Sequence, residues 1–144
     1  SSAASDVYKR QPAGVQLILN EQWQGTLCAA QCDLLRAAEN LLDNAVKYRK
    51  PDQPVDIYLR TWNDNDHLYF SVRDTGLGIK KDNFRKVFDK FYRVHTGNVH
   101  DVKGFGLGLA YVKKIVMLHD GDISIESEYG KGTKFTIKLP IIKD

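Results

Sequence analysis

The segment from Lys103 to Lys114, KGFGLGLAYVKK, carries three glycines at alternate positions directly before an apolar run with helical spacing. Glycine loses more conformational entropy on folding than other residues and weakens any helix that it enters. Three glycines so close together therefore indicate a turn whose structure or function requires glycine. A glycine turn at the start of a helix presents backbone N–H groups that suit a phosphate. The segment fits neither G-x-x-x-x-G-K-[ST] nor the dinucleotide fingerprint, which must follow a strand.

Bulk composition limits the classes of protein that this chain can represent. It has 144 residues, enough for one domain with a buried core, and a mild net charge of +3. Without a clustered basic face there is no reason to expect a nucleic-acid partner. No apolar run approaches the roughly 20 residues that cross a bilayer. We therefore expect a cytoplasmic domain. The composition is also compatible with a longer parent protein that is anchored in the membrane.

Hydrophobic periodicity predicts a folded domain over residues 15–144, whereas residues 1–14 are small, polar and aperiodic. We interpret residues 1–14 as a tail, a linker or a segment added for expression. Strands are expected at 15–19, 23–30, 55–61, 67–74, 122–127 and 133–139. Helices are expected at 34–48, with Asp33 as the N-cap, at 83–88 and at 107–118. This order predicts an α+β fold, a two-layer α/β sandwich with three helices on one face of a mixed, mostly antiparallel sheet of about five strands.

The residues expected in the core recur with helical spacing in the helix and at alternate positions in the strands. In the first long helix they are Leu34, Ala38, Leu41 and Ala45. In the two central strands they are Val55, Ile57, Leu59, Leu68, Phe70 and Val72. Residues 94–103 have few large apolar side chains and no period, which predicts a loop.

A polar stripe follows the first long helix. Asn40, Asn44 and Lys47 lie at i, i+4 and i+7, on one face. Asparagine is a mediocre helix former, so two asparagines at this spacing suggest that the pair serves a function. An amide oxygen can ligate Mg²⁺, and a lysine one turn on can neutralise phosphates. The alternative interpretation is a solvated helix face.

The segment DTGLG, Asp74 to Gly78, directly follows a predicted strand. An aspartate there can accept a hydrogen bond from a ligand while the glycines let the backbone approach closely. Taken singly, such a segment is more often a simple turn. The asparagine stripe, this segment and the glycine turn before the last helix all suit one nucleotide.

These motifs resemble the ATP-binding catalytic domain of bacterial two-component sensor histidine kinases, within the superfamily of the GHKL or Bergerat fold. ENLLDNAVKY resembles the N box of that family, DTGLGI its first glycine box, VFDKFYR its F box and GFGLGLAYVKKIV its second glycine box. GKGTKFTIKLP resembles the closing hairpin. The resemblance covers roughly residues 15–140.

The resemblance implies ATP and Mg²⁺ as cofactors. It makes Asn44 the Mg²⁺ ligand, with Asn40 assisting at the metal or the phosphates. It places Lys47 at the phosphates and Tyr48 along the adenine, and it makes Asp74 the acceptor for the exocyclic amine of the adenine.

The resemblance also assigns a second set of residues to the nucleotide. Gly76 and Gly78 would let the chain pass beneath the base, and Arg93 would reach the terminal phosphate. Lys103 is a weaker candidate for the same phosphate. The other residues of this set are Ile79 in the pocket, Gly104, Gly106, Leu107 and Gly108 at the hinge and phosphate turn of a lid, and Thr133 near the pocket wall.

One position separates types of reaction within the superfamily. Its water-using ATPases carry a glutamate four residues before the metal-binding asparagine. Here that residue is Asn40, which cannot act as a base near neutral pH. Glu39 lies about 100° round the helix and should point elsewhere. The resemblance therefore implies a protein-histidine kinase that holds ATP without efficient hydrolysis, with Asn40, Lys47 and Arg93 as its catalytic residues.

The phosphoacceptor histidine of the family follows a pattern such as H-E-x-R-T-P, which this chain lacks. We therefore expect its partners to be a separate dimerisation and histidine phosphotransfer domain and, through the parent protein, a response regulator. The fragment itself should be monomeric. The alternatives are a non-catalytic nucleotide-sensing module, a related ATPase or serine kinase, and a plain α+β interaction domain with coincidental glycine turns.

Overall fold

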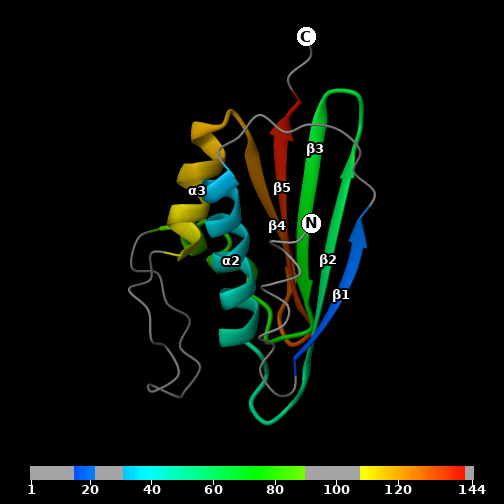
Figure 1. The fold of residues 1–144 in the computed structure, drawn as a ribbon. Helices are drawn as coiled ribbons and strands as arrows, with labels where there is room; N and C mark the ends of the chain where they lie inside the picture. The colour runs from blue at the N-terminus through cyan, green and yellow to red at the C-terminus, as the bar shows by residue number, and fades with distance from the viewer. Residues whose placement is uncertain (1–14, 22–30, 90–107, 142–144) are drawn as a thin grey trace.

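The computed structural model of the chain describes residues 15–21, 31–89 and 108–141. Two layers are evident in Figure 1, where helices α2 (Gln31–Lys47) and α3 (Gly108–Leu118) lie side by side over one face of a five-stranded sheet. The predicted α+β sandwich is therefore confirmed. Neither of these two helices is long and apolar enough to cross a membrane.

The sheet has the order β1-β2-β3-β5-β4. Strand β1 runs parallel to β2, and every other neighbouring pair is antiparallel, so the prediction of a mixed, mostly antiparallel sheet is confirmed. The expected strand at 23–30 lies outside the described residues. The strands are β1 (Val15–Glu21), β2 (Val55–Asn63), β3 (His67–Asp74), β4 (Asp122–Glu128) and β5 (Gly132–Pro140).

Two predictions about the helices are wrong. Helix α2 begins at Gln31, so Asp33 lies inside its first turn and is not the N-cap. The helix expected at 83–88 is instead two short 3₁₀ turns, η1 (Lys81–Asn83) and η2 (Lys86–Phe88). Both turns close with i→i+3 hydrogen bonds, from the Phe84 N–H to the Lys81 carbonyl at 3.1 Å and from the Asp89 N–H to the Lys86 carbonyl at 2.9 Å, and the backbone becomes extended at Asp89.

The core lies between the helices and the sheet. Along α2 the buried residues are Ala37, Leu41 and Ala45, which are four apart. Ala38 was predicted as a core residue but is only half-buried, because Ala37, one position earlier, faces the sheet instead. The side chain of Leu34 lies outside the described part. The predicted strand residues are buried except Phe70, which packs against the core partly exposed. Helix α3 contributes Leu109, Val112, Ile115 and Val116.

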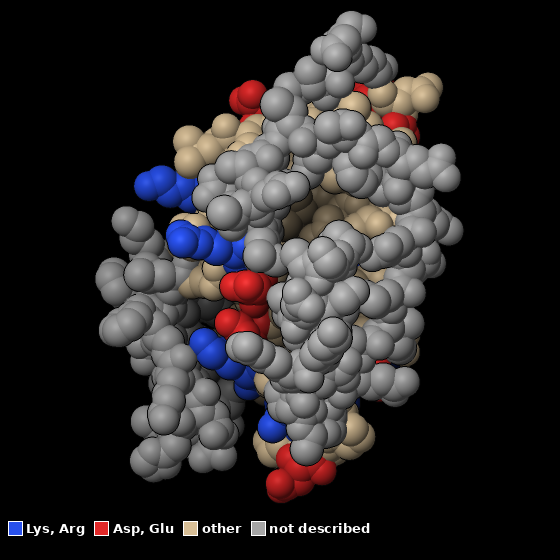
Figure 2. Space-filling model, viewed as in Figure 1, with Lys and Arg blue, Asp and Glu red and all other residues tan. Residues whose placement is uncertain are grey.

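The opposite face of the sheet carries aromatic and basic side chains. The Arg73 guanidinium lies 4.0 Å from the centre of the Tyr58 ring across the β2–β3 pair. In the same pair the rings of Trp62 and Tyr69 stack with centroids 5.2 Å apart. Figure 2 shows the molecule from the same side as Figure 1, where both acidic and basic side chains of the described residues are visible between the grey residues.

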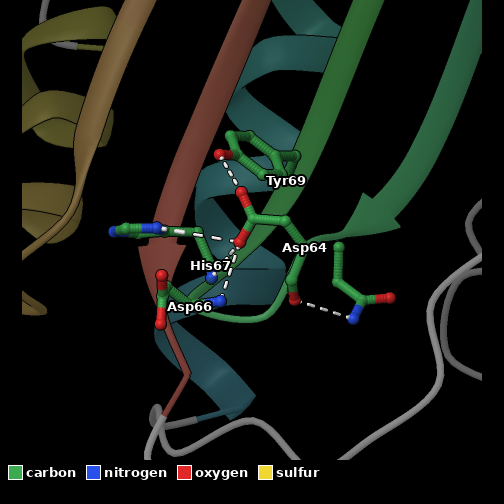
Figure 3. A network of polar contacts seen from close by, with 5 residues as sticks. Asp64, Asp66, His67 and Tyr69 are labelled. Carbon is green, nitrogen blue, oxygen red and sulfur yellow. Dashed lines mark hydrogen bonds and ion pairs between the residues drawn. The ribbon is translucent and has the colours of Figure 1, made fainter.

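The turn between β2 and β3 is held by one carboxylate (Figure 3). The Asp64 side chain accepts hydrogen bonds from the N–H groups of Asp66 at 2.8 Å and His67 at 2.7 Å, and from the Tyr69 hydroxyl at 2.7 Å. These bonds lower the pKa of Asp64 to about 2, with the Tyr69 bond as the largest cause. The turn lies at the opposite end of β3 from Asp74.

Candidate functional site

Four segments converge at the end of β3 that holds Asp74. They are the second half of α2, the turn that follows β3, the first residue of α3 and the β4–β5 hairpin. The Leu77 N–H donates to the Tyr48 carbonyl at 2.9 Å, and the Gly130 N–H donates to the Leu77 carbonyl at 2.6 Å. The turn after β3 is therefore attached to both α2 and the hairpin. The asparagine stripe, the segment from Asp74 to Gly78 and Gly108, which are the described parts of the motifs that the sequence suggested for one nucleotide, therefore lie together.

The polar stripe on α2 faces the start of α3. Asn40 and Asn44 are half-buried, and Lys47 is exposed one turn further on. The Asn40 Nδ2 atom donates to the Arg36 carbonyl at 2.9 Å, which leaves its Oδ1 atom as an acceptor. A Cβ atom on Gly108 would lie 3.3 Å from that oxygen. Glu39 is exposed, as expected for a residue about 100° round the helix.

The side chains of this stripe can bind a hard cation only together with a ligand that supplies further oxygen atoms. Amide oxygens such as those of Asn40 and Asn44 are suitable donors for Mg²⁺. No group of three His, Cys, Asp or Glu side chains in the described part of the chain could hold a metal ion by itself. Mg²⁺ commonly keeps several waters and completes its shell with substrate phosphates. The donor set therefore suits a cation that arrives with phosphates.

Asp74 is a buried carboxyl at the end of β3, with 9% of its surface exposed. Burial raises the pKa of Asp74 to about 6, while the N–H groups of Gly76 and Thr133 and the charge of Arg73 act in the opposite direction. The Gly76 N–H donates to Asp74 Oδ1 at 2.9 Å. A buried acid with a raised pKa is typical of a functional site.

The turn after β3 needs glycine for two different reasons. A Cβ atom on Gly76 would lie 2.7 Å from the Tyr48 carbonyl oxygen, so the close approach of turn and helix excludes a side chain. Gly78 has φ +75°, and a Cβ atom there would also overlap the Glu128 carbonyl. In the structure these two glycines let the turn approach the protein's own backbone, whereas the sequence analysis expected them to let it approach a ligand.

Two hydroxyl groups that the sequence analysis missed secure this turn. Thr75 Oγ1 accepts from the Asp56 N–H at 2.9 Å, which ties the turn to β2. Ser127 Oγ accepts from the Ile79 N–H at 2.7 Å, which ties it to β4. The sequence carried a signal for Ser127: in the alternation of β4 it occupies the inward-facing set that also holds Ile123 and Ile125. A polar residue in that set needs a buried partner.

The structure places some predicted site residues and leaves others outside its described part. Ile79 and Thr133 join the Ser127 contacts, and Thr133 is buried. Phe88 packs edge-on against Phe135 with ring centres 6.1 Å apart, as expected for a core residue. The predicted residues outside the described ranges are Arg93, Lys103, Gly104, Gly106 and Leu107, together with the expected loop 94–103.

Known proteins are similar to this chain in sequence and in fold. The family model described as histidine kinase-, DNA gyrase B- and HSP90-like ATPase matches residues 30–143. The chain is 63% identical over 105 residues to the sensor protein RprX of Bacteroides fragilis (strain YCH46). That match covers 73% of this chain and 20% of RprX, so the chain spans about a fifth of the length of this relative.

Solved structures resemble the fold over nearly the whole chain. The mycobacterial sensor histidine kinase MprB is similar with a TM-score of 0.80 and 28% identity, over 96% of this chain and 91% of that one. Full-length ShkA in complex with AMPPNP is similar with a TM-score of 0.80 and 24% identity, over 96% of this chain and 28% of that one. At that identity, ShkA supports the fold alone.

Proposed function

Because this chain belongs to the histidine kinase-, DNA gyrase B- and HSP90-like ATPase family, we propose that it binds Mg²⁺-ATP and transfers the γ-phosphoryl group to a histidine of a separate domain. The observation that supports this proposal is that the buried Asp74 carboxyl and the Asn40–Asn44 stripe lie at the same end of the fold. In this proposal the chain is the catalytic half of a two-component sensor histidine kinase. The description of the matching family, which names ATPases, supports ATP as the nucleotide.

The adenine end of the site would be built on the turn after β3. Asp74 would accept a hydrogen bond from the exocyclic amine, and its burial makes this contact selective, because an unpaired buried acceptor is costly. Tyr48 would lie along the base. Gly76, Gly78 and Ile79 would form the floor, which the hydrogen bonds to Tyr48, Gly130 and Ser127 hold in place.

The phosphate end would be built on α2 and the start of α3. Asn44 would hold Mg²⁺, with Asn40 beside it, and the ion would neutralise charge on the phosphates. Lys47 and Arg93 would offset the remaining charge, with Lys103 as a further candidate. Gly104, Gly106, Leu107 and Gly108 would supply the phosphate turn, because backbone N–H groups at a helix start attract anions.

The residues at the site favour a kinase over a hydrolase. Asn40 cannot take a proton from water near neutral pH, and the neighbouring carboxylate of Glu39 is exposed on another side of α2. The nucleophile would instead be a histidine ring nitrogen of the partner domain. It would form a bond to the γ-phosphorus as the bond to the β,γ-bridging oxygen breaks, ADP would leave, and the imidazole proton would pass to solvent.

The setting of the domain follows from this activity. The phosphoacceptor would be supplied by the dimerisation domain of a parent kinase, which would then pass the phosphoryl group to a response regulator. We propose that the domain works in the cytoplasm, where ATP is available, and that the isolated fragment is a monomer. Light scattering at several concentrations tests the monomer, and a dimer that persists on dilution would contradict it.

Calorimetric titration with ATP, with and without Mg²⁺, tests the nucleotide site. The wild-type chain should bind ATP in a Mg²⁺-dependent manner with negligible phosphate release, and Asn44→Ala should lose the Mg²⁺ dependence. Asn65→Ala is a matched control, because it removes an exposed amide in the β2–β3 turn. No binding under either condition would contradict the proposal. Transfer to an added dimerisation domain distinguishes a kinase from a nucleotide-sensing module.

A further inference from the structure

Three polar residues form a row across the inner face of the sheet. In the strand register Asp74 of β3 pairs with Thr133 of β5, and Thr133 pairs with Ser127 of β4. Cross-strand partners project to the same face with Cβ atoms about 5 Å apart. The three side chains therefore lie side by side beneath the helices. Thr133 is in the middle, with only 6% of its surface exposed.

The hydrogen bonds of Ser127 determine where its hydroxyl proton lies. Ser127 Oγ is 2.8 Å from the Gly132 carbonyl oxygen, which can only accept, so the single Ser127 proton goes to that oxygen. The Ile79 N–H donates to Ser127 Oγ at 2.7 Å. The remaining contact, 2.9 Å to Thr133 Oγ1, must then be donated by Thr133. Ser127 thereby donates once and accepts twice, which uses its full capacity.

This arrangement fixes the polarity of Thr133. Because its proton is directed to Ser127, its Oγ1 atom has only lone pairs left for other partners. The neighbour of Thr133 on the other side is Asp74, whose carboxylate also accepts hydrogen bonds. We propose that Ser127 is a positioning residue which makes this part of the pocket present two adjacent acceptors, and so selects purines with a 6-amino group over purines with a 6-oxo group. The inference rests on the proposed nucleotide site.

The selectivity has a simple physical cause. The 6-amino group of adenine carries two N–H bonds and can donate to both Asp74 and Thr133. The 6-oxo group of hypoxanthine or guanine is an acceptor, so it would face two acceptors and leave buried groups unpaired. Without Ser127 the Thr133 hydroxyl can rotate and donate its proton to a 6-oxo group. The pocket would then lose part of its discrimination.

Paired titrations with ATP and ITP measure this effect, since the hypoxanthine base of ITP carries an oxygen in place of the 6-amino group, and a proton on N1. They should be made at pH 8, where Asp74 is ionised. We expect Ser127→Ala to lower the ratio of the ITP Kd to the ATP Kd by about tenfold, the factor that corresponds to one hydrogen bond. Ser127→Thr keeps the hydroxyl and should restore the ratio. Ser124→Ala, on the outer face of the same strand, should leave it unchanged.

Ser127 also holds the turn after β3 through its hydrogen bond with Ile79. A loss of ATP affinity in Ser127→Ala could therefore come from a displaced turn and does not by itself test the selectivity. An unchanged ratio in Ser127→Ala would overturn the inference, whatever happens to affinity. If that variant does not fold, Thr133→Val removes the hydroxyl at similar volume and should lower the ratio by the same factor; an unchanged ratio there overturns the inference as well. A wild-type chain that binds ATP and ITP equally refutes only this inference, whereas one that binds neither refutes the proposed function and this inference with it.

Discussion

The Oδ1 atom of Asn40 lies 3.3 Å from the position that a Cβ atom on Gly108 would occupy. The middle of α2 and the first residue of α3 are therefore in close contact. The Asn40 amide cannot simply turn away, because its Nδ2 atom is held by the Arg36 carbonyl at 2.9 Å. A glycine at the start of α3 therefore places no side chain against the Asn40 oxygen.

Gly108→Ala should separate fold stability from nucleotide binding. Alanine favours a helix interior by about 1 kcal/mol over glycine, but at the first residue of α3 this gain is smaller and the contact with the Asn40 oxygen offsets it, so the temperature of thermal unfolding should change little. The new methyl group would press on the Asn40 oxygen and weaken Mg²⁺-ATP binding several-fold, up to about tenfold. In an Asn40→Ala background the substitution should have no further effect on affinity. Equal ATP affinity in Gly108→Ala and wild type would contradict this.

Asp74→Asn should stabilise the domain while weakening nucleotide binding. The pKa of Asp74 is about 6 in the fold, against an ordinary value of 3.8, so the ionised carboxyl costs the folded state about 3 kcal/mol. This cost is absent below pH 3.8 and complete above pH 6. Asparagine keeps an acceptor for the Gly76 N–H. The unfolding free energy of the variant should exceed that of wild type at pH 7.5 and match it near pH 4, and ATP and ADP should both bind more weakly.

The same carboxyl should make nucleotide affinity depend on pH. A protonated Asp74 has one fewer acceptor for the adenine amine, so the ATP affinity of the wild type should fall as the pH drops through about 6. The phosphates of ATP also titrate in this range. Asp74→Asn is therefore the control, since its pH profile reports the ligand alone. Identical profiles for the two proteins would show that Asp74 does not contact the base.

Patterns that repeat along a single element were predictable from the sequence. The helical spacing of Asn40, Asn44 and Lys47 gave the stripe on α2, and the strand before Asp74 placed that residue at a sheet end. The alternation in VDIYLRT gave the buried residues Val55, Ile57 and Leu59 of β2. In each case the period of the element alone decides which residues share a face.

Features that depend on a second element were not predictable. The choice between Ala37 and Ala38 for the core depends on how α2 is rotated against the sheet, and the two differ by only one step of the helix. The contact between Asn40 and Gly108 joins residues that are far apart in sequence. The hydrogen bonds of Ser127 depend on the register of β4 with β5 and on the position of the turn after β3.

Gly76→Ala should destabilise the domain by steric overlap. The added Cβ atom would lie 2.7 Å from the Tyr48 carbonyl oxygen, so α2 and the turn must separate at a cost of about 1–3 kcal/mol. This movement would also displace Asp74, whose Oδ1 atom accepts from the Gly76 N–H, and nucleotide affinity should fall. Gly130→Ala is the control, because its Cβ atom meets no neighbour and its φ of +89° alone should cost about 1–2 kcal/mol. Unfolding in urea compares the two, and unchanged affinity in Gly76→Ala would argue against the proposed adenine floor.

Tyr69→Phe should weaken the β2–β3 turn in a pH-dependent manner without affecting the nucleotide site. The Tyr69 hydroxyl is the largest cause of the low pKa of Asp64, about 2, so its removal should raise that pKa toward 3.8. A depressed pKa adds stability above the ordinary value, and this stability is lost as the pH falls through the folded value. NMR titration of the Asp64 carboxyl measures the shift directly. ATP affinity should stay at the wild-type value, because the turn lies at the far end of β3 from Asp74. An Asp64 pKa that stays near 2 in the variant would mean that the N–H groups of Asp66 and His67 alone hold the carboxylate.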